Sequence, residues 1–200
     1  MTGDRLKTVL DLIDRANAGD PNSTEVERGS TCPAELVYGQ RMSRNLERFC
    51  GQASEHLRIA ARAQHIERWK SPRNSYPQGR VGYLKWRKDL KDYHARRAGE
   101  LMLEAGYERE DAKRVGALIR KERLKHDDEA QALEDVACLV FLEHYAAAFI
   151  AEHPDDKVIA ILGKTAAKMS AAGLAAATRL GLPERLSRLL HEALETAKEN

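Results

Sequence analysis

Apolar side chains recur every three or four residues along most of this 200-residue chain, which is the spacing of amphipathic α-helices. No stretch alternates between apolar and polar residues with period two, so the pattern predicts no β-sheet. The predicted helices span residues 3–18, 34–49, 54–69, 81–105, 110–124 and 128–152, followed by two or three shorter ones over 155–198. We therefore expect an all-α, single-domain helical bundle with its core at about 34–152.

The composition narrows the class of protein. A hydrophobic content of 42% is enough for one domain with a buried core. The formal net charge of +2 argues against a protein that coats nucleic acid non-specifically, which needs a strong basic excess. None of the three cysteines forms a C-x-x-C pair, and the longest apolar run, Val136 to Leu142, is far too short to cross a bilayer. We expect a cytoplasmic location and no membrane partner.

Positive charge is concentrated between Arg58 and Arg97, and again in the segment RKERLK from Arg120 to Lys125. Arginine side chains bind phosphate through two parallel hydrogen bonds, and aromatic rings stack on a base or a sugar. A solvated helix face has the same composition, so charge alone does not decide between the two interpretations. The candidate substrate-binding residues are Arg62, Gln64, Arg68, Trp69, Arg73, Tyr76, Arg80, Arg87 and Lys121.

Polar side chains are also predicted inside the bundle. On the long helix, the positions predicted to face inward are Tyr83, Arg87, Leu90, His94, Ala98, Leu101 and Ala105. His65 belongs to the inward face of the preceding helix, and Asp135 directly precedes the apolar run. Imidazole and carboxylate together suit Zn, Mn or Fe, so His65, His94 and Asp135 are candidate ligands of one divalent metal. The alternative is a hydrogen-bonded core without a metal, in which Asp135 pairs with Arg62 or Arg87.

A resemblance to a known family is carried by four runs: LIDRANAGDPN, YGQRMSRNLERF, RAQHIERWKSPRNSYPQGRVGYLKWRKDL and LEDVACLVFLEHY. They are similar to an uncharacterised bacterial and fungal family known only as domain of unknown function 4202. The likeness covers most of the chain. Because that family has no settled activity, the resemblance implies relatedness and no mechanism.

Three runs also resemble helices of the HD phosphohydrolase fold: LRIAARAQHIERW, DYHARRAGELMLEAGYEREDAKRVGALIRKE and ALEDVACLVFLEHY. This resemblance implies an HD-like core with metal ligands at His94 and Asp135, His65 beside them, and Glu122 as a further acidic group. The chain departs from the HD pattern, because Gln64-His65 stands where that fold has a His-Asp pair. The resemblance therefore implies one metal or none.

Two functions are expected from these residues. The first is a metal-dependent phosphohydrolase acting on a nucleotide or another phosphorylated small molecule, with Glu122 as general base if its side chain points inward. The second is a non-catalytic helical protein that binds a nucleotide or RNA through residues 62–97. A third class of function is that of a helical interaction protein, whose surface contacts another subunit.

Overall fold

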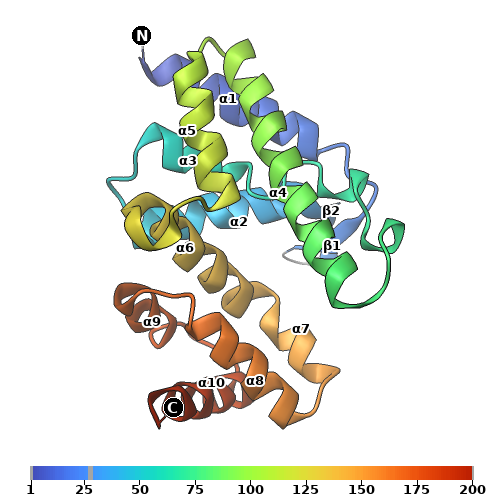
Figure 1. The fold of residues 1–200 in the computed structure, drawn as a ribbon, viewed down its shortest axis with the longest axis vertical. Helices are drawn as coiled ribbons and strands as arrows, with labels where there is room; N and C mark the ends of the chain where they lie inside the picture. The colour runs from blue at the N-terminus through green and yellow to red at the C-terminus, as the bar shows by residue number, and fades with distance from the viewer. Residues whose placement is uncertain (1, 27–28, 200) are drawn as a thin grey trace. The chain divides into compact units, whose positions relative to one another are not determined.

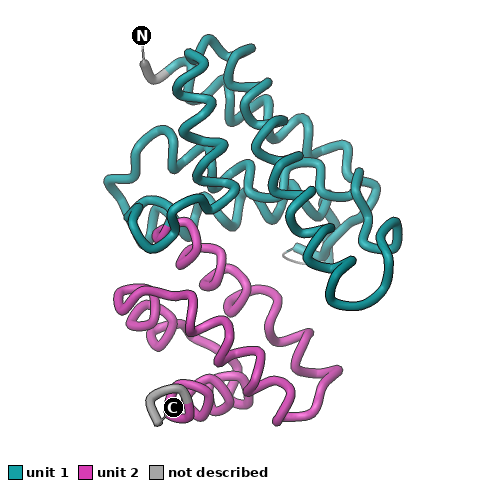
Figure 2. The backbone as a smooth tube through the Cα atoms, in the orientation of Figure 1, with its two compact units in different colours: residues 1–130 teal, residues 131–200 magenta. Residues whose placement is uncertain are grey.

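The structure, a computed structural model, describes residues 2–26 and 29–199 and consists almost entirely of α-helices (Figure 1). This confirms the predicted all-α fold. The chain divides into two compact units, Met1–Ala130 and Gln131–Asn200 (Figure 2). Among the described residues, no helix is both long enough and apolar enough to span a membrane.

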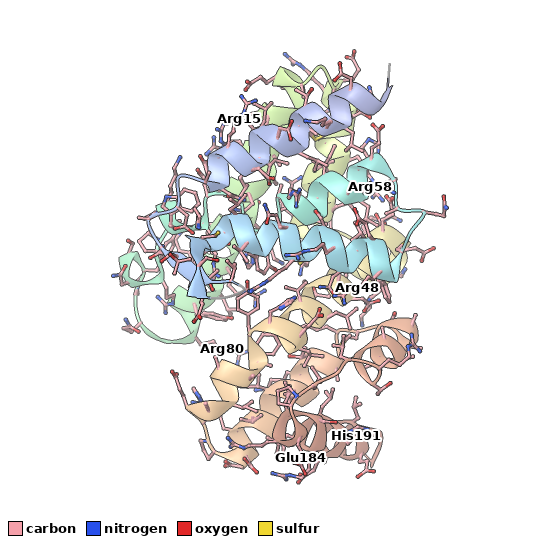
Figure 3. The ribbon with its side chains drawn as sticks, turned by 180° about the vertical axis from the view of Figure 1, so that it is seen from behind. Arg15, Arg48, Arg58, Arg80, Glu184 and His191 are labelled. Atoms are coloured by element: carbon pink, nitrogen blue, oxygen red, sulfur yellow. The ribbon has the colours of Figure 1, made fainter. Side chains whose placement is uncertain are left out.

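Unit 1 is a layered helical bundle. Its helices are α1 (Thr2–Asn17), α2 (Ala34–Phe49), α3 (Glu55–Arg62), α4 (Gly79–Glu104) and α5 (Arg109–Arg120), with the short 3-10 helices η2 (Arg68–Lys70), η3 (Arg73–Ser75) and η4 (Leu124–His126). The short α3 packs against α1, α2 and α5. Helices α4 and α5 lie side by side on one side of the unit, and α1 and α2 are seen from the other (Figures 1 and 3). Fully buried aliphatic side chains such as Ile13, Met42 and Leu118 fill the core.

The segment predicted as a loop between the first two helices contains a two-stranded antiparallel sheet. Strand β1 (Ser23–Glu25) pairs with β2 (Thr31–Pro33). The nearby carboxylate of Asp20 accepts hydrogen bonds from the backbone N–H groups of Asn22 and Glu35. Strands of three residues are too short to show period-two alternation, which is why the pattern did not predict them.

The third predicted helix, over 54–69, ends earlier than its apolar pattern indicated. Helix α3 stops at Arg62, and Glu67 has a φ of 52°, in the left-handed region that a right-handed helix excludes. The backbone N–H of Glu67 donates a hydrogen bond of 2.9 Å to Oδ1 of Asn17, at the end of α1. A tertiary contact therefore replaces the next turn of helix with an irregular turn over residues 63–67.

The N-terminal half of α4 turns a different face inward from the predicted one. The spacing placed Tyr83 and Arg87 in the core, whereas the structure buries Gly82 and Trp86 and leaves Tyr83 and Arg87 exposed. The loop before α4 determines this orientation, because Nε1 of Trp86 donates a hydrogen bond of 2.9 Å to the carbonyl oxygen of Ser71. The same loop leaves no room beside Gly82, where a Cβ would lie 1.9 Å from a backbone oxygen.

The helices after α5 are α6 (Asp128–His144), α7 (Ala146–Ala151), α8 (Asp155–Ala166), α9 (Ala171–Ala177) and α10 (Glu184–Glu199). The predicted helix over 128–152 is interrupted at Tyr145, whose φ of −127° is not helical. Within unit 2, α8 packs against α10, and side chains such as Val136, Leu162 and Leu189 are buried.

Candidate ligand-binding site

A cavity of about 230 Å³ opens in unit 1 where the turn after α3 meets α4 and the end of α5. It is lined by Gln64, His65 and Arg68 of the turn and η2, by Tyr83, Trp86, Arg87, Leu90, Lys91 and His94 of α4, and by Ile119 and Lys121 at the end of α5. The sequence had singled out six of these residues: Gln64, His65, Arg68, Arg87, His94 and Lys121. The cavity combines buried polar groups with a strongly basic rim.

Asn17 fixes the turn that carries Gln64 and His65. Its side chain is 1% exposed and bonds in two directions. Its Oδ1 accepts from the backbone N–H of Glu67, and its Nδ2 donates to the carbonyl oxygen of Glu35 at 3.3 Å. One buried amide therefore ties the ends of α1 and the turn to the first turn of α2.

Glu67 anchors the same turn to α4. Its carboxylate accepts hydrogen bonds from the Tyr93 hydroxyl at 2.6 Å, from Lys70 Nζ at 2.7 Å and from Arg97 Nε at 3.1 Å. A non-glycine residue with positive φ carries roughly 1–2 kcal/mol of strain. These bonds hold Glu67 in that conformation, and they place the residues before it against the cavity.

His94 is a buried polar residue of the cavity wall. Its Nδ1 lies 2.7 Å from the carbonyl oxygen of Ile66 and must donate to it, because a carbonyl oxygen can only accept. Burial, with the nearby ring of His65, lowers the pKa of His94 to about 3. The ring is therefore neutral at pH 7, and its Nε2 is a hydrogen-bond acceptor.

His65 lies beside His94, with 6.0 Å between the ring centroids. The ring of His65 stacks on Tyr38 of α2, at a centroid distance of 4.0 Å and an interplanar angle of 9°. Burial, together with the positive charges of Arg68, Lys121 and Arg87, lowers the pKa of His65 well below 6.5. His65 is therefore neutral at pH 7, and the effect on its pKa shows that positive potential converges on the cavity.

The side chain of Glu35 lies close to that of His65. Its Oε2 lies 3.6 Å from Nδ1 of His65, too far for a hydrogen bond. Burial raises the pKa of Glu35 to about 7, although the positive charge of Arg68 opposes this. The carboxyl group is therefore only partly ionised at neutral pH, which is unusual for glutamate.

Two arginines form the mouth of the cavity. The guanidinium carbon of Arg68 lies 5.3 Å from the centre of the Trp86 ring, and Arg87 NH1 donates to the Tyr83 hydroxyl at 3.2 Å. Within residues 2–26 and 29–199, neither arginine forms an ion pair with a carboxylate. Neither charge is therefore paired with a carboxylate at ion-pair distance, although Arg68 lies near enough to Glu35 to oppose the rise in the pKa of that carboxyl group.

Lys121, at the end of α5, lines the cavity in an uncommon backbone conformation. Its φ is 59°, and the backbone N–H of Glu122 bonds to the carbonyl oxygen of Ala117, which ends α5 in a Schellman-like turn. Glycine is the usual residue at this position. A lysine kept in a strained position on a cavity is an indication of function.

Five predicted substrate-binding residues lie outside the cavity lining: Arg62, Trp69, Arg73, Tyr76 and Arg80. Arg62 pairs with a carboxylate of α1 at 3.1 Å, and Trp69 is half-buried. Arg73 donates to two backbone carbonyls, one in its own loop and one at the start of α4, while the Tyr76 hydroxyl donates to a carboxylate of α4. Arg80 is exposed at the start of α4. Arg62, Arg73 and Tyr76 thus have structural contacts that account for them.

Glu122 and Asp135 are not placed as the sequence interpretation required. Glu122 is exposed and accepts a hydrogen bond from Arg120 Nε at 2.6 Å, so its side chain does not point inward. Asp135 is buried without an arginine: Oδ1 accepts from Ser170 N at 2.8 Å and Gln131 Nε2 at 3.1 Å, and Oδ2 accepts from Ser170 Oγ at 2.6 Å. Asp135 therefore holds the N-terminal end of α9 inside unit 2.

The predicted metal ligands are brought together in part. His65 and His94 share the cavity, and His94 has the arrangement common in metal-bound histidines, with one ring nitrogen held by a backbone carbonyl and the other unengaged. The carboxylate of Asp135 is occupied by the hydrogen bonds of unit 2. In the part of the chain that the structure describes, no three His, Cys, Asp or Glu side chains gather as a metal site. A bound metal stays a prediction.

Sequence reasoning missed Asn17, Glu35, Glu67 and Trp86. Three of them are polar residues in helical or turn segments, where local pattern gives no sign of burial. The one available signal was that three of them, Asn17, Glu67 and Trp86, lie in runs already noted for their family resemblance. The roles of the four residues depend on contacts across 15 to 50 positions of sequence.

Comparison with known proteins adds a family and no activity. Residues 7–190 match the model of a family described as "Domain of unknown function (DUF4202)". No curated protein and no solved structure matches the chain.

Proposed function

Since the chain belongs to this family of unknown function, we propose from the cavity alone that it binds a phosphorylated small molecule. The observation that carries the proposal is the pair of mouth arginines, Arg68 and Arg87, which have no carboxylate partner among the described residues. Guanidinium groups bind phosphate oxygens in a fixed fork geometry. A phosphate dianion at the mouth would neutralise both charges.

Cavity size and wall chemistry support a small ligand. Pockets for drug-sized ligands measure about 300–1,000 Å³, and this cavity of about 230 Å³ lies below that range. Trp86 and Tyr83 offer aromatic surface against which the carbon face of a ligand packs. A strand of RNA needs an extended basic groove instead. Binding of RNA through residues 62–97 is therefore the less supported alternative.

The test is a titration with ribose 5-phosphate and with a single-stranded RNA, followed by calorimetry or by tryptophan fluorescence. The pocket variants are Arg68→Met and Arg87→Met. The matched controls, Arg80→Met and Arg15→Met, remove the same charge from exposed positions outside the cavity lining (Figure 3). We expect each pocket variant to weaken sugar-phosphate binding roughly tenfold or more, about 1.4 kcal/mol, and the controls to leave it unchanged.

Two outcomes contradict the proposal. If all four variants weaken binding equally, the interaction depends on overall charge and the RNA alternative gains support. If the wild-type protein binds neither phosphate nor sugar phosphate at millimolar concentration, the cavity is not a phosphate site.

Hydrolysis of the bound ester is the second candidate function. Its support is the unengaged Nε2 of His94, oriented as in a metal-bound histidine. In the same titrations with added Mn²⁺, release of inorganic phosphate that is lost in His94→Asn would support hydrolysis. Tight binding of the ester without release of inorganic phosphate would show that the protein binds its ligand without hydrolysing it.

A further inference from the structure

The cavity floor presents two buried polar atoms without a hydrogen-bond partner among the described residues, Gln64 Oε1 and His94 Nε2. Gln64 is 7% exposed and His94 is 3% exposed, and both line the cavity. Buried polar atoms in folded proteins are almost always paired, so two such atoms in one cavity indicate a missing partner. A ligand bound in the cavity is a partner that could reach both.

Both atoms require a hydrogen-bond donor. The Nδ1–H of His94 is used by the carbonyl oxygen of Ile66, so Nε2 is left with only its lone pair. The burial that keeps this ring neutral at pH 7 prevents Nε2 from becoming a donor. An amide oxygen such as Gln64 Oε1 also only accepts. A phosphate dianion has no hydrogen to give, so the ligand must carry its donors on another group.

We propose that the ligand is the phosphate monoester of a small polyol or sugar, whose hydroxyl groups donate to Gln64 Oε1 and His94 Nε2 while its phosphate faces Arg68 and Arg87. This inference rests on the proposed phosphate-binding function and adds the class of ligand. The hydroxyl groups pair with the two buried acceptors of the cavity floor, and the carbon face of the ligand lies against Trp86. The small volume favours a sugar phosphate over a complete nucleotide.

The proposal predicts strong discrimination by hydroxyl groups. A site built to hydrogen-bond a hydroxyl rejects an analogue that lacks it, because the buried acceptors are then left unpaired and cut off from water. Glycerol 3-phosphate and n-propyl phosphate form a matched pair, because they share the phosphate and the three-carbon chain and differ in two hydroxyls. We expect glycerol 3-phosphate and ribose 5-phosphate to bind at least about tenfold more tightly than propyl phosphate.

The variant Gln64→Met tests whether the buried acceptors recognise the ligand's hydroxyl groups, because it keeps the side-chain length and removes the acceptor Oε1. It should reduce the preference for glycerol 3-phosphate over propyl phosphate without abolishing it, because His94 Nε2 still accepts one hydroxyl. Propyl phosphate, which pairs with neither acceptor, should bind to the variant no more weakly than to the wild-type protein. Gln52→Met makes the same substitution at an exposed turn and should keep the preference. Because Gln64 Oε1 bonds to no described group, its removal should not lower the melting temperature.

Each result has one meaning. Equal binding of glycerol 3-phosphate and propyl phosphate by the wild-type protein overturns the polyol inference and leaves the phosphate site intact. Failure of every phosphate ester to bind overturns the proposed function, and the inference with it. Tighter binding of AMP than of ribose 5-phosphate replaces a sugar phosphate by a nucleotide and overturns the ligand class. If Gln64→Met does not fold, the comparison of the two esters on the wild-type protein decides alone.

Discussion

Replacing Glu35 by glutamine is expected to stabilise the folded chain by about 3 kcal/mol at pH 8 and hardly at all at pH 4. Burial raises the pKa of Glu35 to about 7, from an ordinary value of 4.5, and the charge of Asp20 adds to this while the charge of Arg68 opposes it. Between those two values the folded state binds more protons than the unfolded state. Stability from this group is therefore full below pH 4.5 and is lost as the pH rises through 7.

The magnitude follows from the two pKa values. Each pKa unit is worth about 1.36 kcal/mol, so the interval from 4.5 to about 7 gives about 3 kcal/mol once Glu35 is fully ionised. Glutamine is neutral throughout and does not have this pH-dependent loss. Urea unfolding of both proteins from pH 4 to pH 8 measures the difference directly.

The matched control for Glu35→Gln is Glu25→Gln, in the neighbouring strand β1, where the side chain is exposed. Its effect should be small and the same at each pH. If the gain from Glu35→Gln is also independent of pH, the carboxyl group is not buried as the structure has it. The carboxyl group of Glu35 lowers the stability of the fold when it ionises. Buried groups with shifted pKa values of this kind are typical of functional sites, which favours a role for Glu35 in the adjacent cavity.

Replacing Glu67 by alanine is expected to destabilise unit 1 by about 3 kcal/mol, because three hydrogen bonds are lost at roughly 1 kcal/mol each. The side chain of Glu67 is 6% exposed and accepts bonds from Lys70, Tyr93 and Arg97. Alanine removes all three bonds and keeps the strained left-handed backbone. Thermal or urea unfolding gives the size of the loss, and the sugar-phosphate titration should weaken as well because the turn carries Gln64 and His65.

Two further variants separate strain from bonding at Glu67. Glycine adopts positive φ without a steric penalty, so Glu67→Gly should be less destabilising than Glu67→Ala by about 1 kcal/mol. Glu100→Ala removes an exposed partner of Arg96 and Arg97 and should cost at most about 1 kcal/mol. A loss from Glu67→Ala no larger than that from Glu100→Ala would show that the Glu67 network is not buried.

The helices that the sequence predicted best are those whose ends are set locally. Helix α2 has the predicted bounds, 34–49, because Pro33 precedes an amphipathic run that ends before Gly51. The end of α3 was predicted wrongly because Asn17, 50 positions away, takes the N–H of Glu67 that a longer helix would have used. No local signal in the stretch RAQHIERWK reports that contact.

In the candidate site, too, the sequence predicted the locally determined features and not those that depend on tertiary contacts. The basic residues and histidines around the cavity belong to types that bind phosphate, so composition and spacing were enough to select five of them, although not Lys91. The inward face of α4 was wrong by one position, since packing of the preceding loop selects Trp86 over Arg87. The polar groups that hold the turn, Asn17 and Glu67, become recognisable only when α1, α2 and α4 are brought together.

Histidine ring nitrogen NMR, recorded with and without glycerol 3-phosphate at pH 7, tests the central claim most directly. We expect free His94 to have a protonated Nδ1 and an unprotonated Nε2. Saturating ligand should shift the Nε2 resonance as a new hydrogen bond is accepted and leave Nδ1 in place. The exposed His191 of α10 is an internal control and should not change (Figure 3). A protonated Nε2 in the free protein, or an Nε2 resonance unchanged at saturation, would contradict the account.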